Sequence, residues 1–222
     1  MGREVAPAER EAIYTDEPAS AERHIRADAA RNRDLLLDAA AAAFAARGAD
    51  VPLEDIARGA GVGIGTLYRH FPTREALVEA VYRHEVGILC ERADELLSTL
   101  PPDQALAEWM HLFVRHIATK RGMLSVLKPM MNANSSLSAD TRGRVVDTAS
   151  RLLAAGVAAG TVRDDIEGAD LVRAVGGICM STDQERSQAS ERLVGLLFDG
   201  LRHGAASPPA AAPSAAARDV PA

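Results

Sequence analysis

Apolar residues recur every three or four positions along most of this chain, which is the spacing that places them on one face of an α-helix. The segment 28–47 shows this pattern first, and Gly48 follows it where a helix would end. Its predicted buried face consists of Leu36, Leu37, Ala40 and Phe44. The segment 103–120 carries a similar stripe, formed by Leu106, Trp109, Met110, Phe113 and Ile117. These periods predict an all-α protein.

Further helices follow from the same periodicity and from the residues that interrupt it. Pro101-Pro102 and Gly122 break the pattern, because proline and glycine disfavour a helix interior. A polar loop is expected at 132–136 and a connector at 160–165. The remaining helices are predicted as two short ones within 53–72, followed by 73–98, 123–131, 139–159, 169–180 and 184–203.

The distribution of these segments predicts two domains. We expect a helix-turn-helix domain at 28–80 and a helical ligand-binding and dimerisation domain at 81–204, linked by the long helix that begins at Thr73. The residues 1–27 show little periodicity and are predicted to form a flexible arm. The Ala/Pro-rich residues 205–222 are predicted to be disordered.

Composition narrows the class of protein. The two cysteines, Cys90 and Cys179, lie inside helical apolar patterns and lack the spacing of a metal site, so reduced thiols are expected. No apolar run approaches the ~20 residues that span a bilayer. The N-terminus lacks the apolar core of a signal peptide. We therefore expect a cytoplasmic protein with no membrane partner, no metal and no cofactor.

The net charge of −6 argues mildly against nucleic-acid binding, but the charge is unevenly distributed. Residues 1–19 hold two basic and five acidic side chains, whereas residues 20–75 hold eight of each. Within the second stretch, four arginines precede or open the first helix: Arg23, Arg26, Arg31 and Arg33. A basic arm at this position suits contact with phosphate or with a minor groove.

The stretch Leu53–Pro72, LEDIARGAGVGIGTLYRHFP, has the outline of a helix-turn-helix. Gly61 stands where a left-handed C-terminal cap ends the first short helix. Phe71-Pro72 ends the second, because proline disfavours a helical residue before it. Thr73 is then the predicted N-cap of the long helix.

The run from about Arg31 to Glu85 resembles the DNA-binding domain of the tetracycline-repressor (TetR) family of bacterial transcription regulators. The resemblance rests on separate pieces in the family's order and spacing: Leu36 to Ala40, Phe44 to Gly48, Asp55 to Ala57, Ala60 to Val62, Gly65 to Tyr68, His70 to Pro72 and Arg74 to Leu77. It implies a regulator that binds double-stranded DNA, with Thr66, Tyr68, His70 and Arg74 in contact with it.

From the residues themselves, the N-terminal turn of the second short helix is expected nearest the bases. That turn holds Gly63, Ile64, Gly65 and Thr66. Tyr68 and His70 are expected to meet phosphate, and Arg69 to reach either target. The alternative is that Tyr68 packs its ring and His70 caps locally.

Two departures from the family pattern bear on base recognition: Pro52 replaces a common hydroxyl residue, and Gly63-Ile64 replaces common polar ones. Neither Gly63 nor Ile64 supplies a donor to a base edge, although Ile64 suits a thymine methyl. We therefore expect heavy reliance on backbone contacts, the basic arm and DNA shape.

The helical second half resembles the effector-binding and dimerisation domain of the same family. That resemblance implies a homodimer, with the last two helices forming a four-helix interface with their copies. The last helix carries a wide apolar stripe that suits this role, and its predicted interface residues are Leu193, Leu196, Leu197 and Leu201.

A pocket for a small, largely apolar effector is also expected in the second half. Large and adaptable apolar side chains there suit either a ligand cavity or an ordinary core. The candidate lining is Trp109, Met110, Phe113, His116, Met123, Leu127, Met130, Met131 and Met180.

Taken together, the predicted function is a dimeric repressor released from a palindromic operator by its effector. The alternative is a helical ligand-binding or interaction module whose helix-turn-helix no longer binds a DNA sequence. An enzyme is not expected, because Gly61 to Gly65 follows a helix rather than a strand, and Ile88 stands where His84-Glu85 would need a second zinc-binding histidine.

Overall fold

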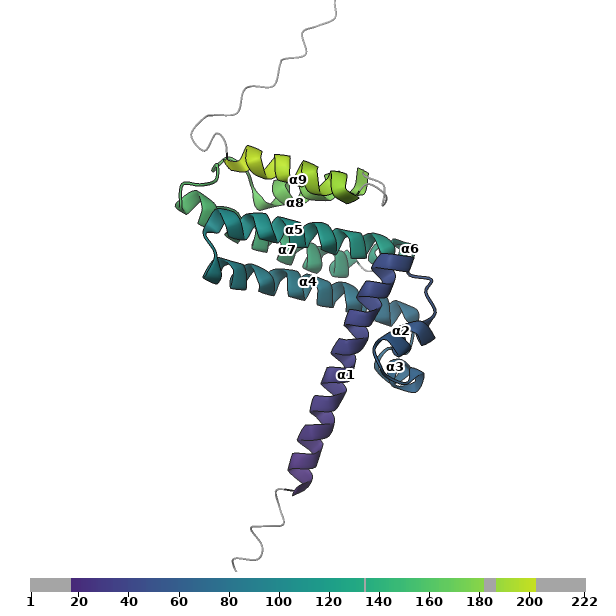
Figure 1. The fold of residues 1–222 in the computed structure, drawn as a ribbon. Helices are drawn as coiled ribbons and strands as arrows, with labels where there is room; N and C mark the ends of the chain where they lie inside the picture. The colour runs from purple at the N-terminus through teal and green to yellow at the C-terminus, as the bar shows by residue number, and fades with distance from the viewer. Residues whose placement is uncertain (1–16, 134, 182–186, 203–222) are drawn as a thin grey trace, which may run out of the picture. The chain divides into compact units, whose positions relative to one another are not determined.

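The computed structural model describes residues 17–133, 135–181 and 187–202, and it contains nine α-helices and no strand within those ranges. The predicted all-α class is confirmed. The helices are labelled in Figure 1 and are α1 Glu17–Arg47, α2 Leu53–Gly59, α3 Ile64–His70, α4 Arg74–Thr99, α5 Pro102–Gly122, α6 Leu124–Ala133, α7 Ser135–Ala158, α8 Gly168–Ser181 and α9 Ser187–Arg202.

The first helix begins at Glu17 rather than at Asp28, so residues 17–27 are helical where an arm without periodicity was predicted. This part of α1 has no apolar stripe to reveal it. Further along α1, the exposed Arg31 forms an i,i+3 ion pair with Asp28. Pro18 falls in the first turn, where a missing N–H breaks no helical hydrogen bond. Residues 1–16 of the predicted arm and the predicted tail at 205–222 lie outside the described ranges.

The polar loop predicted at 132–136 is the second difference. Helix α6 continues to Ala133 and α7 begins at Ser135, which leaves only residue 134 between the described helices. The asparagines and serines here suggested a loop because their side chains compete for backbone hydrogen bonds. Leu137 and Thr141, which follow that segment in the first turns of α7, are both buried.

The described residues pack as two units. Unit 1 comprises 17–85 together with 119–133, and unit 2 comprises 86–118, 135–181 and 187–202. The sequence predicted a contiguous boundary near residue 80, whereas the end of α5 and all of α6 pack with the N-terminal helices. The contact is close, because a Cβ on Gly122 would lie only 2.0 Å from the carbonyl oxygen of Phe44.

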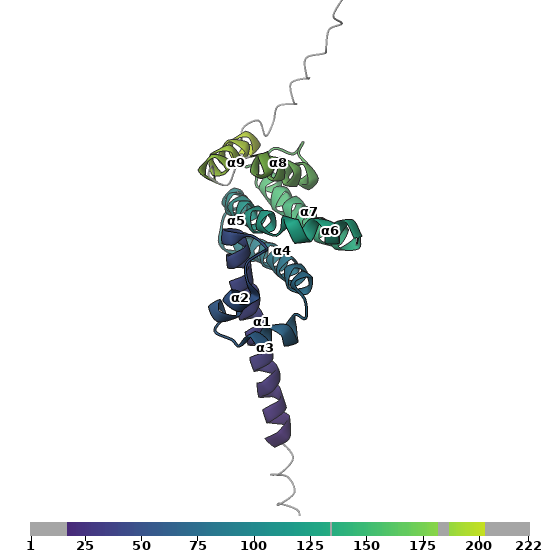
Figure 2. The same ribbon diagram turned by 90° about the vertical axis from the view of Figure 1, so that its right-hand side faces the viewer.

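Unit 1 has its core where α1, α2 and α3 meet. Leu36, Phe44, Ile56 and Leu67 are each no more than 1% exposed. These positions are the apolar ones of the sequence pattern, and they lie on the facing sides of the three helices. The α1 to α3 arrangement is visible from two directions in Figures 1 and 2. As predicted, Thr73 caps α4, since its hydroxyl oxygen accepts a hydrogen bond from the Ala76 amide at 3.1 Å.

Unit 2 is a helical bundle. The fully buried Trp109 joins α5 to α4 by donating its indole N–H to the carbonyl of Leu89 at 3.0 Å. Helices α7 and α8 cross closely at Gly168, where a Cβ would lie 2.2 Å from the Ser150 hydroxyl oxygen. Helices α8 and α9 lie side by side in both ribbon views (Figures 1 and 2).

Candidate nucleic-acid interface

The turn between α2 and α3 is fixed by its backbone. Gly61 has a backbone φ of +70°, which residues other than glycine rarely adopt. Its amide donates a hydrogen bond to the carbonyl of Arg58. The amide of Val62 donates to the carbonyl of Ala57 at 3.0 Å. This pair of hydrogen bonds is the Schellman motif that commonly ends a helix at glycine. The predicted C-terminal cap at Gly61 is therefore confirmed.

Helix α3 is anchored on one side and open on the other. Leu67 is fully buried, and Ile64, Thr66 and His70 are half-buried. Tyr68 is 47% exposed. The remaining exposed positions of this surface are Gly63, Gly65 and Arg69. The helix thus presents a rigid outer face to solvent.

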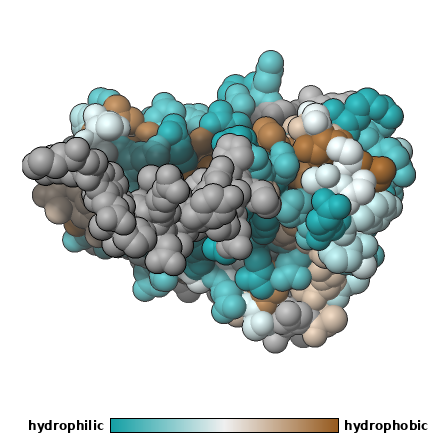
Figure 3. Space-filling model, turned by 90° about the horizontal axis from the view of Figure 1, so that it is seen from below, coloured by the Kyte–Doolittle hydropathy of each residue, from teal (hydrophilic) through white to brown (hydrophobic). Residues whose placement is uncertain are grey.

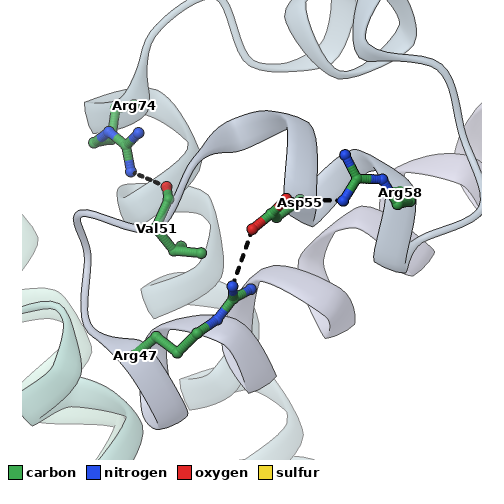
Figure 4. A network of polar contacts seen from close by, with 5 residues as sticks. All are labelled: Arg47, Val51, Asp55, Arg58 and Arg74. Carbon is green, nitrogen blue, oxygen red and sulfur yellow. Dashed lines mark hydrogen bonds and ion pairs between the residues drawn. The ribbon is translucent and has the colours of Figure 1, made fainter.

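Arg74, predicted to contact DNA phosphate, makes contacts inside unit 1 that the sequence did not reveal. Its Nη1 donates hydrogen bonds to the carbonyls of Ala49 and Val51, the latter at 2.7 Å (Figure 4). These carbonyls belong to the loop between α1 and α2. Arg74 therefore holds that loop against the start of α4, and its phosphate contact stays a prediction for its other N–H groups.

A second polar cluster ties α2 to α1. Asp55 accepts from Arg47 at the end of α1 and from Arg58 within α2, both at 3.0 Å (Figure 4). Both arginines are at least half exposed, so each pair contributes little to stability by itself. Both arginines are therefore already paired with a carboxylate of the same chain.

Arg33 lies over the ring of Phe71 at 5.7 Å, and it borders a hollow of about 470 Å³ in unit 1. The other charged and titratable residues of its lining are His70, Glu79, Arg83 and His84. Arg83 is paired with Glu79 at 3.0 Å. Sequence reasoning missed Arg83 and His84 as neighbours of His70, because they lie on α4 and no motif links them to α3.

The buried end of this region contains a perturbed carboxyl group. Burial raises the pKa of Glu85, the nearby His84 lowers it, and Asp38 raises it. His84 itself lies 3.3 Å from Asp38 and so bridges α4 and α1. Glu85, His84 and Asp38 therefore form a charged group that joins α4 to α1, with Asp38 largely exposed.

The predicted effector residues do not all fall in one unit. In unit 2, the ring of Phe113 lies 5.3 Å from Trp109 and 6.1 Å from His116 in a stacked row, and Met110 is buried beside them. In unit 1, Met123 and Leu127 are core residues, 1% and 0% exposed, while Met130 and Met131 are half-buried. Met180, also predicted to line the pocket, is 52% exposed on α8.

A second hollow, of about 500 Å³, lies between α7 and the start of α8 in unit 2. Its lining is mainly apolar, with Val146, Leu153 and Ile166 among its members, and it contains none of the predicted effector residues. It is bordered by Asp164 and Glu167 at one side.

The predicted dimer residues differ in exposure. Leu193 and Leu196 are 43% and 66% exposed, and Leu197 is half-buried. Leu201 is buried within its own unit, and its carbonyl accepts a hydrogen bond from the Arg163 amide at 2.9 Å. The apolar surface that α9 offers is therefore centred on Leu193 and Leu196.

None of the described helices is both long and apolar enough to cross a bilayer. In the view from below, hydrophilic residues cover most of the visible described surface, and the apolar patches are separate from one another (Figure 3).

Comparisons with known proteins place the chain among transcriptional regulators. Residues 36–81 match the model for bacterial regulatory proteins of the tetR family, and residues 101–203 match the C-terminal domain of SbtR-like transcriptional regulators. The crystal structure of the TetR regulator SCO0520 from Streptomyces coelicolor is 43% identical, with a TM-score of 0.71 over 77% of this chain and 98% of that one. A TetR regulatory protein from Mycobacterium vanbaalenii is 38% identical, with a TM-score of 0.64 over 80% and 99%.

A curated relative, the HTH-type transcriptional repressor KstR2 of Mycolicibacterium smegmatis, is 42% identical over 71 residues. That match covers 32% of this chain and 35% of the repressor, so it spans about a third of the relative's length.

Proposed function

Because the chain belongs to the TetR family of bacterial transcriptional regulators, we propose that it is a homodimeric repressor that acts in the cytoplasm. Each protomer places α3 in the major groove of one half of a palindromic operator, and a small, largely apolar effector releases the dimer from DNA.

The proposal that the protein binds DNA rests on the outer face of α3, which is exposed to solvent while the inner face is packed against unit 1. Leu67 and the Schellman turn fix the helix, while Tyr68 and the glycines of its first turn face solvent. Thr66, Tyr68 and His70 are proposed to position the DNA backbone, and Arg31 and Arg33 to extend those contacts from α1. A short recognition helix makes few base contacts alone, so pairing two copies on a palindrome doubles them.

Dimerisation is proposed through α8 and α9. Leu193, Leu196 and Met180 are large apolar side chains exposed on these neighbouring helices. Isolated apolar residues are common on protein surfaces, but three on adjacent helices favour burial against a second copy. A two-fold interface then uses the same patch on both protomers. This assigns Met180 to the dimer interface rather than to the effector pocket.

The effector is proposed to bind in unit 2 near the aromatic row of Trp109, Phe113 and His116. Helices α4 and α5 each contain residues of both units, and α4 also carries Arg74, so a shift of α4 would reach a predicted DNA contact along one continuous helix. A coupling of ~1–3 kcal/mol changes operator affinity by ~5–150-fold, which is sufficient for a switch.

Selection of bound duplexes from a random pool by the purified protein tests this function, together with the molar mass in solution. Enrichment of a palindrome, a dimeric mass and a steep fall of affinity with salt are the expected results. Tyr68→Ala is the control for the exposed face of α3. If the wild-type protein enriches no sequence, the result supports the alternative of a ligand-binding module that no longer binds a DNA sequence.

A further inference from the structure

The first turn of α3 contains two glycines that the fold of the chain does not require. Gly63 has φ −73° and ψ 149°, an extended conformation open to any residue, and Gly65 lies inside the helix. A Cβ at either position would meet nothing within 4 Å in the structure. Glycine also weakens a helix relative to alanine. The lack of side chains at these two positions leaves the backbone of this turn open to a partner that approaches from outside the chain.

Arg69 is distinguished from the other arginines around it. In residues 26–83, all of which the structure describes, every other arginine has a hydrogen bond, an ion pair or a ring contact within the chain. Arg69 has none and is exposed. Its guanidinium is therefore available to an external partner at no cost in broken intramolecular contacts.

Helical geometry directs Arg69 toward the bare turn. Gly65 and Arg69 are one turn apart, and both lie on the side of α3 opposite the buried Leu67. Side chains on a helix lean toward its N-terminus, so Arg69 covers the surface above Gly65. That is the end of α3 expected nearest the bases. Tyr68 lies to one side of this line and the half-buried Thr66 to the other.

We propose that Arg69 determines the sequence specificity of this protein by donating two hydrogen bonds to a guanine in the major groove of each half-site. The absence of side chains at Gly63 and Gly65 lets the helix approach closely enough for the guanidinium to reach the base. Arginine paired with the O6 and N7 atoms of guanine is the commonest specific contact to DNA. The inference rests on the proposed function, because it assumes that α3 enters the groove. It also supplies the base-edge donor that Gly63 and Ile64 lack.

The test repeats the selection from a random duplex pool with the wild type, Arg69→Ala, Arg69→Lys and a matched control, Arg142→Ala. Arg142 is an exposed arginine of α7 without an intramolecular partner, so its removal loses the same charge away from α3. Lysine at 69 keeps the charge but lacks the planar fork that matches guanine. Circular dichroism verifies that each variant is folded.

The wild type is expected to enrich a guanine at one fixed position of each half-site. Arg69→Ala should lose that preference and bind the selected operator roughly 5- to 150-fold more weakly per half-site, the range of a good bidentate pair. Arg69→Lys should weaken the preference while keeping the wild-type salt dependence, and Arg142→Ala should match the wild type in both.

A phosphate contact would give a different result and would overturn the inference. Arg69→Ala would then keep every base preference, lose affinity equally for all sequences, and reduce the salt slope by ~1. If the wild type itself enriches no sequence, the proposed function fails, and the specificity role of Arg69 fails with it. A motif that Arg69→Ala preserves refutes only the specificity role.

Discussion

The backbone of Gly122 lies close to the end of α1, and replacing this glycine by alanine tests how that contact supports unit 1. The new Cβ would lie 2.0 Å from the carbonyl oxygen of Phe44 and 2.7 Å from its carbonyl carbon. Real Cβ atoms essentially never come within 3.0 Å of another atom, so the two backbones must separate by at least the missing ångström. No side-chain rotation relieves this clash, because both partners are main-chain atoms.

The displaced carbonyl also has a structural role. It accepts the hydrogen bond from the Gly48 amide at 2.9 Å that ends α1. The loop that follows contains Ala49 and Val51, the two carbonyl partners of Arg74. A shift at Phe44 therefore reaches the contacts that hold the loop between α1 and α2. Overpacking of this kind typically costs about 1–3 kcal/mol. For a chain of this size, that lowers the midpoint of thermal unfolding by roughly 2–12 °C.

Thermal unfolding followed by circular dichroism measures the effect, with Gly143→Ala as the matched control. Gly143 lies within α7, and a Cβ there would meet nothing within 4 Å. Alanine at this position should stabilise the protein by about 0.5–1 kcal/mol, since it restricts the unfolded chain and favours the helix. A loss of stability for Gly122→Ala beside a gain for Gly143→Ala would show that the effect at Gly122 comes from the backbone contact and not from helix propensity. A Gly122→Ala protein as stable as the wild type would refute the reasoning from the backbone contact.

Four further predictions concern unit 1 and the dimer. Arg74→Ala and Arg74→Lys should both destabilise the protein by about 1.5–3 kcal/mol in urea unfolding, because both lose the hydrogen bonds to the loop carbonyls. Only Arg74→Ala should change the salt slope of DNA binding, because lysine keeps the positive charge. Gly65→Ala should unfold at the same or a higher temperature yet bind operator more weakly, because its Cβ occupies the space for DNA. Burial in the folded protein raises the pKa of Glu85 above its ordinary 4.5. The stability that Glu85 contributes should therefore be fully present below pH 4.5 and be lost as the pH rises through the pKa of the folded state. Unfolding midpoints measured across pH should show this decline for the wild type and not for Glu85→Gln. Leu196→Asp should weaken the dimer by at least ~100-fold in sedimentation, because two copies each lose about 1.5–3 kcal/mol of apolar burial.

Each of these predictions has an outcome that contradicts it. Unchanged urea unfolding of Arg74→Lys would mean that the loop contacts contribute nothing. A Gly65→Ala protein with full operator affinity would show that DNA does not approach this turn. An identical pH profile for Glu85→Gln would assign the dependence to other groups. For the dimer, Val157→Asp is the control, since Val157 is an exposed apolar residue of α7, and equal weakening by both variants would remove α9 from the interface.

The sequence predicted most of the helices because their apolar periods are strong and their ends carry glycine or proline. Gly61 and Phe71-Pro72 set the bounds of α2 and α3 in this way. The early start of α1 could not be predicted by the same means, since residues 17–27 carry no apolar stripe. The continuation of α6 and α7 through the polar segment was missed because burial of Leu137 and Thr141 overrides the local preference of serine and asparagine for loops.

The candidate site shows a similar division. The exposed face of α3 was predictable, because a motif of fixed spacing specifies which residues of the helix turn outward. The loop contacts of Arg74 were not, since its carbonyl partners are backbone atoms more than twenty residues away and carry no side-chain signature. The packing of Met123 and Leu127 in unit 1 was also hidden, because a buried methionine has the same pattern in a core as in a ligand pocket.

Three glycines of unit 1 illustrate how the structure separates folding requirements from functional ones. Gly61 needs its left-handed φ, and Gly122 needs its close contact with Phe44, so the fold explains both. Gly65 has neither requirement, and its presence lowers the stability of a helix that is only one or two turns long. In the proposed complex, the missing side chain at Gly65 leaves room for DNA to approach the turn. The sequence predicted the cap at Gly61 and the DNA-facing place of Gly65, whereas the close contact of Gly122 with Phe44 could be seen only in the structure.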